Sequence, residues 1–537
     1  MLSCSLDYTL HANVPFSRSS PQWESATNDQ IHNYQVCLNT MLHSFSLCES
    51  IRNCTVIGMG CDHQKEISTY HDKIINAMIV STETHILCQS NTSTYKKKVI
   101  PGWDAEMDCA REESLLWHYI WAQCDKPVTG IVYDIMRKCR SAYHYKLRSL
   151  KKEKLAKIKI SVSKTVLKSS SKQYWKTVKL LRKNNYNTTS EVDGNVGNVE
   201  IANHFQRKFG LLFNSVKSTN EQLDNLQECI NKRVRDLCDS DMIDKAMHCH
   251  NICKDDVKKA VMKLKSDKID EGGALFSNNF IHGTDLLYMY ISVLFCTMIS
   301  HGFAPERFLR STMIPIPKGA RANLSDSNMY RSIAISSLLS KILDNIIIEQ
   351  QYSSLSTSCY QFGFKPNSST VLCSTMLIET VQYYLEKGDK SVYVLLLDAS
   401  KAFDKVSFDV LFNLLLARNV CPRIINVLYY MYTNQTCYVK WNNECSSSFS
   451  VSNGVKQGGV ISPLLFSVYI DNLFNELKEL GLGCYVGTTY AGAFGYADDI
   501  ALISPSIYSL KKMIRICESY AAKYHITFNP SKSKLQC

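Results

Sequence analysis

The sequence lacks the features that would place the chain in or across a membrane. Its longest apolar run, near residues 286–300, is too short to span a bilayer. The first residues contain no basic stretch followed by an apolar one, so nothing indicates a secretory signal. We therefore expect an intracellular protein, in the nucleus or the cytoplasm, that is not secreted and has no membrane partner.

Cysteine patterns typical of metal sites are also missing. The chain has 22 cysteines, but no two of them are spaced as C-x-x-C. Disulfides are rare in a reducing compartment, so we expect these thiols to be free core and surface residues. The tightest group, formed by His248, Cys249, His250 and Cys253, is a candidate zinc site, but surface and core residues are the simpler interpretation.

The length of 537 residues is enough for about three domains with ordinary buried cores. The patterning divides the chain into four zones. Residues 1–135 are weakly patterned, and residues 136–240 combine a basic helical segment with a polar linker. Residues 241–385 and 386–537 carry dense helix and strand patterns.

Acidic residues are nearly absent between positions 137 and 183, which hold 17 lysines or arginines but a single acid. Charge of one sign, interleaved with tyrosine and tryptophan, is typical of a surface that binds phosphates and stacks on bases. A solvated basic helix without a ligand is the alternative. We predict nucleic-acid binding by this segment, centred on Lys151, Lys152, Lys154, Lys157 and Lys159.

The last two zones predict an α+β fold in which helices stack on one face of a small, largely antiparallel sheet. A continuous apolar run at 390–400 indicates a buried strand. A hairpin is expected at 436–454. Helical patterns occupy residues 404–419, 421–435, 462–480 and 507–526, the third of them opened by Ser462 as N-cap and Pro463 at the first position.

Asp498 and Asp499 are adjacent between two strand-like segments, "AFGYA" and "IALIS". Neighbouring side chains of a strand point to opposite faces, so the two acids share a site only where the chain turns, and we predict a hairpin tip. The simple alternative is a turn that uses Asp for its backbone hydrogen bonds. A third acid, Asp398, ends the most apolar strand. Three carboxylates from two strand ends would hold two hard divalent cations suited to phosphoryl transfer.

Three segments resemble the motifs of reverse transcriptases of non-LTR (LINE-type) retrotransposons. These are "LLLDASKAFDKVSFDVL", "NGVKQGGVISPLLFSVYIDNL" and "YADD", in the family's order and spacing. The likeness covers residues 250–537. It implies a right-hand polymerase fold with a fingers-like region over 241–385 and a palm over 386–537, whose antiparallel sheet is backed by helices. The helical basic region precedes the fingers. It also implies that the family's thumb is absent, and we expect the chain to be truncated at both ends.

The resemblance assigns roles to individual residues. Asp398 and Asp498 would ligate both Mg²⁺ ions, for which Mn²⁺ can substitute, with Asp499 nearby. Phe403 would exclude a ribose hydroxyl and so select dNTPs, although an anchor for the following helix is the simpler role. The remaining nucleotide-binding residues would be Gln457 and Gly458 under the nucleotide, Lys318 and Arg331 on the triphosphate, and Lys532 or Lys534 on pyrophosphate.

The implied activity is RNA-directed DNA polymerisation, with an RNA template, a DNA primer and dNTPs as partners. An RNA-dependent RNA polymerase would place a polar group at position 403, where this chain has Phe403. The other alternative is an inactive truncated relic that acts at most as a nucleic-acid-binding protein.

Overall fold

The computed structural model describes residues 20–52, 54, 63–89, 105–167, 189–216, 219–239, 251–319, 322–388 and 391–537. These residues form two compact units. The smaller unit spans Asn91–Thr188, and the larger one combines Met1–Ser90 with Thr189–Cys537. The four predicted zones, with boundaries at 135, 240 and 385, remain a prediction.

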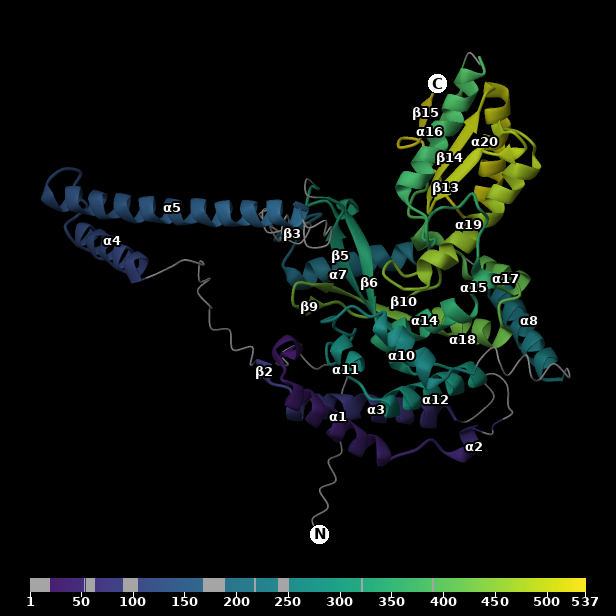
Figure 1. Cartoon of the computed structure of the whole chain (residues 1–537), viewed down its shortest axis with the longest axis horizontal. Helices are drawn as coiled ribbons and strands as arrows, with labels where there is room; N and C mark the ends of the chain where they lie inside the picture. The colour runs from purple at the N-terminus through teal and green to yellow at the C-terminus, as the bar shows by residue number, and fades with distance from the viewer. Residues whose placement is uncertain are drawn as a thin grey trace, which may run out of the picture. The chain divides into compact units, whose positions relative to one another are not determined.

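The smaller unit is a helical hairpin of α4 (Ala105–Gln123) and α5 (Ile131–Leu167). Trp121 fixes the turn between them, since its indole Nε1 donates a hydrogen bond to the carbonyl of Pro127 at 2.9 Å. The 37 residues of α5 carry most of the predicted basic segment (Figure 1). Residues 137–167 of that segment therefore belong to one long helix, and most of their described side chains are exposed or half-buried.

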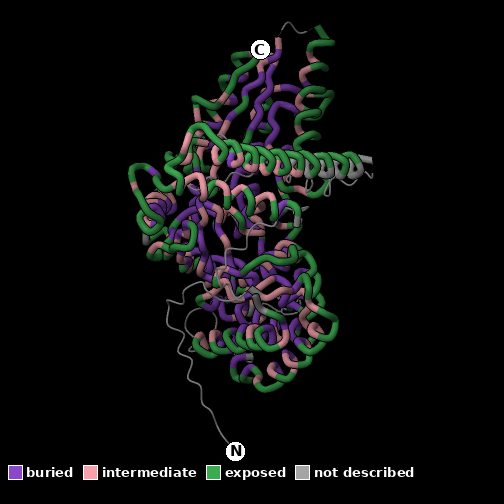
Figure 2. Tube along the Cα trace, turned by 90° about the vertical axis from the view of Figure 1, so that its left-hand side faces the viewer, coloured by how far each residue is buried: buried purple, intermediate pink, exposed green. Residues whose placement is uncertain are grey.

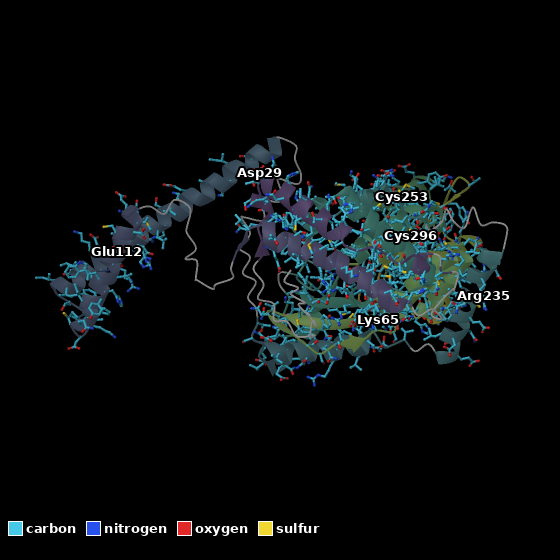
Figure 3. The ribbon with its side chains drawn as sticks, turned by 90° about the horizontal axis from the view of Figure 1, so that it is seen from below. Asp29, Lys65, Glu112, Arg235, Cys253 and Cys296 are labelled. Atoms are coloured by element: carbon cyan, nitrogen blue, oxygen red, sulfur yellow. The ribbon has the colours of Figure 1, made fainter. Side chains whose placement is uncertain are left out.

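The larger unit begins with a layer of amphipathic helices. α1 (Asn28–His43) and α3 (Gln64–His85) pack against each other and against α12 (Asp285–His301). Tyr34 and Leu38 of α1 and Ile74 of α3 are fully buried in this contact. α10 (Lys254–Met262) covers another side of α12, and Figure 3 shows Cys253, before α10, beside Cys296 of α12.

A five-stranded sheet follows, in the order β10-β8-β5-β6, with β9 paired to β8. Its strands are β5 (Arg310–Pro317), β6 (Tyr330–Ser336), β8 (Thr436–Trp441), β9 (Glu444–Cys445) and β10 (Phe449–Ser450). β5 and β6 form a hairpin, whereas β5 and β8 run parallel although more than a hundred residues separate them. The predicted hairpin at 436–454 is thus the edge of a larger sheet.

A four-stranded antiparallel sheet holds the end of the chain, in the order β13-β14-β7-β15 (Figure 1). Its strands are β7 (Tyr393–Asp398), β13 (Ala493–Tyr496), β14 (Asp499–Ser504) and β15 (Lys534–Gln536). The helices α16 (Thr370–Glu386), α19 (Ser462–Glu479) and α20 (Ile507–Lys523) pack against it. The predicted α+β architecture, an antiparallel sheet backed by helices, is confirmed.

Helices lie on both faces of this sheet rather than on one. Leu395 and Leu397 of β7 belong to the main core with α19 and α20, whereas Val394 belongs to a smaller core with residues of α16. Figure 2 shows these buried strands between helices whose outer turns are exposed. The prediction of a fully buried strand fails at Leu396, which is 41% exposed.

The other elements connect these layers. The N-terminal part contains β1 (Ser20–Pro21), η1 (Trp23–Ser25), α2 (Glu49–Arg52), β2 (Cys88–Gln89), β3 (Glu191–Val192), β4 (Asn195–Val196), α7 (Asn198–Leu212) and α8 (Asn220–Asp239). The middle contains α11 (Ser277–Ile281), α13 (Glu306–Leu309), η2 (Ser327–Met329), α14 (Leu338–Gln350) and α15 (Tyr352–Leu355). The C-terminal part adds η3 (Phe403–Lys405), α17 (Phe408–Ala417), α18 (Pro422–Thr433), β11 (Tyr485–Val486) and β12 (Thr489–Tyr490).

Two local predictions need comment. α19 begins at Ser462, with Ile461 as its N-cap, so the predicted cap lies one residue inside the helix. Among the described residues, no helix is both long enough and apolar enough to cross a bilayer.

Candidate active site

The three acids predicted to form a metal site lie at one end of the four-stranded sheet. β7 ends at Asp398 and β14 begins at Asp499, and the strand register pairs these two residues directly. Directly opposed residues point to the same face with Cβ atoms about 5 Å apart. Asp498 and Ala497 form the two-residue loop between β13 and β14, so the predicted hairpin tip is present. The fold therefore brings all three acids together.

Electrostatic repulsion from neighbouring acids contributes to raised pKa values at Asp498 and Asp499. Burial, followed by the charges of Asp499 and Asp398, raises the pKa of Asp498, while Arg331 lowers it. Burial and then Asp398 raise the pKa of Asp499, and Lys532 opposes the shift. Asp498 and Asp499 thus ionise against the charges of neighbouring carboxylates, and a bound cation would relieve this repulsion.

The donor set fits a hard divalent cation, because all three side chains offer carboxylate oxygens. The carboxylate oxygens of the three acids do not all lie within 4.8 Å of one another. Of the described residues, only Cys54, His63 and His301 form a group of three whose ligand atoms do. Lys532 Nζ lies 3.3 Å from Asp398 Oδ2 and partly neutralises it. Cation binding at Asp398 would therefore displace Lys532 and turn the carboxylates inward.

Gln361 fixes the backbone of the Asp498 loop from a distant part of the chain. Its side-chain oxygen accepts hydrogen bonds from the amides of Ala497 (2.9 Å) and Gly363 (2.8 Å), and its Nε2 donates to the carbonyl of Ala497 (3.2 Å). Ala497 has φ of 60°, a left-handed conformation that a residue with a Cβ rarely adopts. Gln361 is fully buried and holds this strained residue in place.

Four basic side chains lie beside the acids, and the charges of three of them, Lys532, Arg331 and Lys401, act on the fourth, Lys318. Burial and then the charges of Lys532, Arg331 and Lys401 lower the pKa of Lys318. Lys318 and Arg331 are exposed, and Lys318 Nζ donates to the carbonyl of Asn328 at 2.7 Å. The predicted triphosphate ligands therefore lie near the predicted pyrophosphate ligand Lys532. Lys534, in β15, is exposed and pairs with Leu396 of β7.

Phe403 forms part of an aromatic group at the start of η3. Its ring stacks on Phe466 of α19 at a centroid distance of 4.6 Å and meets Phe364 edge-on at 6.3 Å. The side chain is only half-buried, so one part anchors η3 and another part remains accessible. Both roles considered for Phe403 are compatible with this geometry.

Gln457 and Gly458 line the same region through contacts with protein. Gln457 Nε2 donates to the Oδ1 of buried Asp404 at 2.7 Å, and burial raises the pKa of Asp404 to about 6. Gly458 has φ of 118°, and a Cβ there would lie 2.6 Å from the carbonyl of Ala334. The close approach that requires glycine is therefore to β6.

The predicted nucleic-acid-binding lysines all lie on α5. Lys152 and Lys159 are exposed, while the side chains of Lys151, Lys154 and Lys157 lie outside the described residues. The helix thus presents at least two of the five charges to solvent.

Sequence reasoning missed three residues of this site: Gln361, Lys401 and Asp404. Lys401 and Asp404 follow Asp398 closely, and both lie inside a motif already singled out, so their position was a usable signal. The role of Gln361 had no local signal in the sequence, because its partner Ala497 is 136 residues away.

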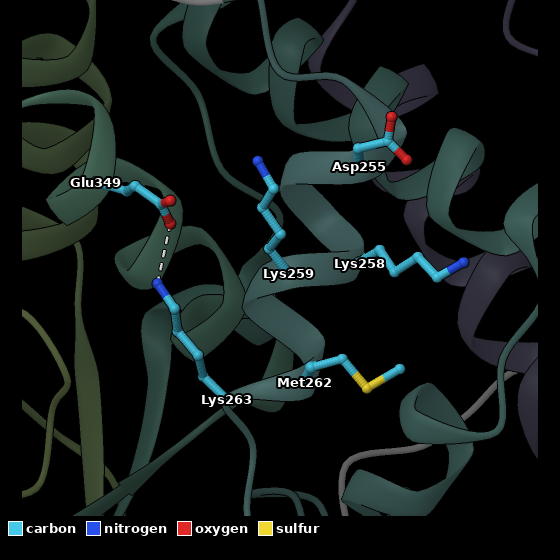
Figure 4. Close-up of a pocket in the computed structure, with 6 residues that line it drawn as sticks. All are labelled: Asp255, Lys258, Lys259, Met262, Lys263 and Glu349. Carbon is cyan, nitrogen blue, oxygen red and sulfur yellow. Dashed lines mark hydrogen bonds and ion pairs between the residues drawn. The ribbon is translucent and has the colours of Figure 1, made fainter.

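A shallow hollow on α10 is unrelated to the carboxylates. It is lined by Asp255, Lys258, Lys259, Met262, Lys263 and Glu349, with Lys263 and Glu349 paired at 2.9 Å (Figure 4). None of these residues contacts the acids of the four-stranded sheet, so the hollow has no part in this site.

Comparison with known proteins agrees with the site. Residues 316–537 match the family described as reverse transcriptase (RNA-dependent DNA polymerase). The Pol polyprotein of the type-2 retrotransposable element R2DM of Drosophila melanogaster is 25% identical over 263 residues, which are 49% of this chain and 24% of that protein. The RNA-directed DNA polymerase of the mobile element jockey of Drosophila funebris is 26% identical over 301 residues, which are 53% of this chain and 32% of that protein.

Among solved structures, apo telomerase from Candida tropicalis, truncated from its C-terminal domain, matches with a TM-score of 0.32 and 17% identity, over 44% of this chain and 51% of that one. The match to the curated relatives spans about a quarter to a third of their length.

Residues 316–537 therefore resemble a reverse transcriptase domain. The relatives that the chain resembles come from retrotransposons of the non-LTR kind.

Proposed function

We propose that the chain acts as an RNA-directed DNA polymerase. The 3′ oxygen of a DNA primer attacks the α-phosphorus of a dNTP that is paired with an RNA template. The primer hydroxyl releases its proton to solvent, and its oxygen forms a P–O bond to the α-phosphorus. The bond between that phosphorus and pyrophosphate breaks, and pyrophosphate leaves with the electron pair of the broken bond. The observation that carries this proposal is the pairing of Asp398 with Asp499 beside the Asp498 loop.

Asp398 and Asp498 would hold the metal, with Asp499 beside them. Two Mg²⁺ ions, or Mn²⁺ in their place, would supply a lowered pKa for the primer hydroxyl and charge stabilisation for pyrophosphate. Lys532 would leave Asp398 and move to the pyrophosphate. Lys318, Arg331 and Lys401 would attract the triphosphate, and the fork of Arg331 suits its oxygens.

The open part of the sheet supports the same proposal. Side chains alternate along a strand, so Leu396 and Asp398 share one face of β7. That face is covered by α16 at Val394 and exposed at Leu396. An exposed apolar residue next to a catalytic acid suits a surface on which the primer–template lies.

The test is primer extension by the full chain on an RNA template with Mg²⁺ and dNTPs. Asp498→Asn keeps the size of the side chain but removes its charge, and we expect extension to fall below detection. The control is Asp255→Asn, which removes an exposed acid on α10 and should extend like the wild type. Extension that survives Asp498→Asn would refute the site.

A wild type that binds RNA but does not extend a primer would favour the inactive, nucleic-acid-binding alternative. The exposed lysines of α5 support that second function, because they do not depend on the acids.

A further inference from the structure

Two histidines and a cysteine converge in the helical layer of the larger unit, on elements that carry none of the carboxylates. Cys54 follows α2, His63 caps the start of α3, and His301 is the last residue of α12. Their ligand atoms all lie within 4.8 Å of one another, and no other set of three or more such residues among the described ones does so. The three come together through the packing of α3 on α12.

His301 provides the observation that points to a ligand. Its side chain is buried, with 3% of the residue exposed. Nδ1 lies 2.9 Å from the carbonyl oxygen of Thr297, which can only accept, so Nδ1 carries the proton. Nε2 is buried and has no hydrogen-bond partner among the residues that the structure describes. A buried polar atom without a hydrogen-bond partner costs about 1–3 kcal/mol, so the unpaired Nε2 of His301 needs an explanation.

The electronic state of His301 suits a metal ligand. Burial lowers the pKa of the His301 ring, the hydrogen bond to Thr297 opposes this shift, and His63 adds to it. In this tautomer Nε2 holds its lone pair toward the cluster, while the Nδ1 hydrogen bond to Thr297 orients the ring. Metal-bound histidines commonly have such a second hydrogen bond to a backbone carbonyl.

Backbone geometry keeps His301 in position. Gly302 ends α12 with φ of 60°, and a Cβ there would lie 2.1 Å from the side-chain nitrogen of Asn426. The ring of His63 meets that of His301 edge-on, at 76° and 5.7 Å between centroids. Because the rings do not stack, small rotations can turn a nitrogen of each toward a common centre.

We propose that Cys54, His63 and His301 bind a zinc ion that links Cys54 and the start of α3 to the end of α12. Thiolate and imidazole ligands favour zinc over the magnesium that carboxylates select. Tetrahedral Zn–S and Zn–N bonds place ligand atoms about 3.3–3.8 Å apart, so each separation has to shorten by no more than about 1.5 Å. Binding converts the Cys54 thiol to a thiolate and releases its proton to solvent. The fourth position is open to water.

Cobalt titration of the chelator-treated full chain tests this site directly. Co²⁺ bound to a thiolate gives a charge-transfer absorption in the near ultraviolet, which Co²⁺ at carboxylates does not give. We expect the band in the wild type and in Cys48→Ser, whose exposed cysteine precedes α2. Cys54→Ser should lose it. His301→Gln should weaken Co²⁺ binding at least tenfold, whereas His43→Gln, on exposed α1 surface, should not.

A second measurement covers the case in which Cys54→Ser does not fold. In the wild type, Zn²⁺ should slow alkylation of Cys54 at least tenfold and leave Cys48 unchanged, as read for each cysteine by mass spectrometry. Equal alkylation of Cys54 with and without Zn²⁺, or a cobalt band that persists in Cys54→Ser, would overturn the proposal. Neither readout depends on polymerase activity.

Discussion

At the residue scale, Gln361 is the side chain on which the Asp498 loop depends most. Replacing it with the similarly sized Met would leave the amides of Ala497 and Gly363 and the carbonyl of Ala497 without their partners. We expect Gln361→Met to lower the free energy of unfolding by at least about 3 kcal/mol, since three groups lose their partners and each buried unsatisfied group costs about 1–3 kcal/mol. Primer extension should fall at least tenfold under conditions in which the variant remains folded.

Gln435→Met is the matched control for Gln361→Met. Gln435 is also buried, but its side-chain oxygen has no partner to lose. Urea unfolding should show a smaller loss for Gln435→Met than for Gln361→Met. Equal losses would mean that the hydrogen bonds of Gln361 do not stabilise the loop.

Phe403 carries the second prediction at this scale, on sugar selection. Phe403→Ala removes the ring that would clash with a ribose 2′-hydroxyl, so we expect the ratio of kcat/KM for rNTP to that for dNTP to rise at least tenfold. The ratio is measured within one preparation, so the stability lost with the Phe466 stacking does not affect it. An unchanged ratio would leave Phe403 with its anchoring role alone.

At the element scale, α5 is expected to bind RNA through its charge. The double variant Lys152→Glu, Lys159→Glu reverses two exposed lysines, and the slope of log K against log salt should become shallower. Lys511→Glu with Lys512→Glu makes the same charge change on exposed positions of α20 and should leave the slope closer to that of the wild type. The measurement is RNA affinity between low and moderate salt. Equal slopes for the α5 variant and the wild type would show that α5 does not bind the RNA.

Elements were predicted well where local periodicity determines them. β7, β14 and the helices α17, α18 and α20 follow apolar patterns that are visible in a short window. The parallel pairing of β5 with β8 and the Gln361 contact with Ala497 depend on residues more than a hundred positions apart, which no local pattern encodes. The exposure of Leu396 was not predicted for a related reason, because whether an apolar residue is covered depends on which helix packs over it.

At the scale of the whole molecule, buried acids make stability depend on pH. Burial raises the pKa of Asp270 from 3.8 to about 6, although its Oδ1 accepts a hydrogen bond from the amide of Leu338 at 2.6 Å. The folded state therefore holds a proton that the unfolded state has lost between pH 4 and 6. Because the folded state binds more protons in this window, the contribution of Asp270 to the free energy of unfolding falls as pH rises.

Asp270→Asn isolates this contribution, because Asn keeps an acceptor for the Leu338 amide and never ionises. Near pH 4 the variant and the wild type should be about equally stable. Above pH 6 the variant should gain relative to the wild type, by up to about 3 kcal/mol, since one pKa unit corresponds to about 1.4 kcal/mol. Urea midpoints at pH 4.5 and 7 measure the difference, and Asp255→Asn, at an exposed acid, should show no such change. A difference between Asp270→Asn and the wild type that does not grow with pH would show that Asp270 is ionised in the folded protein throughout, and that solvent or Arg307 compensates its charge.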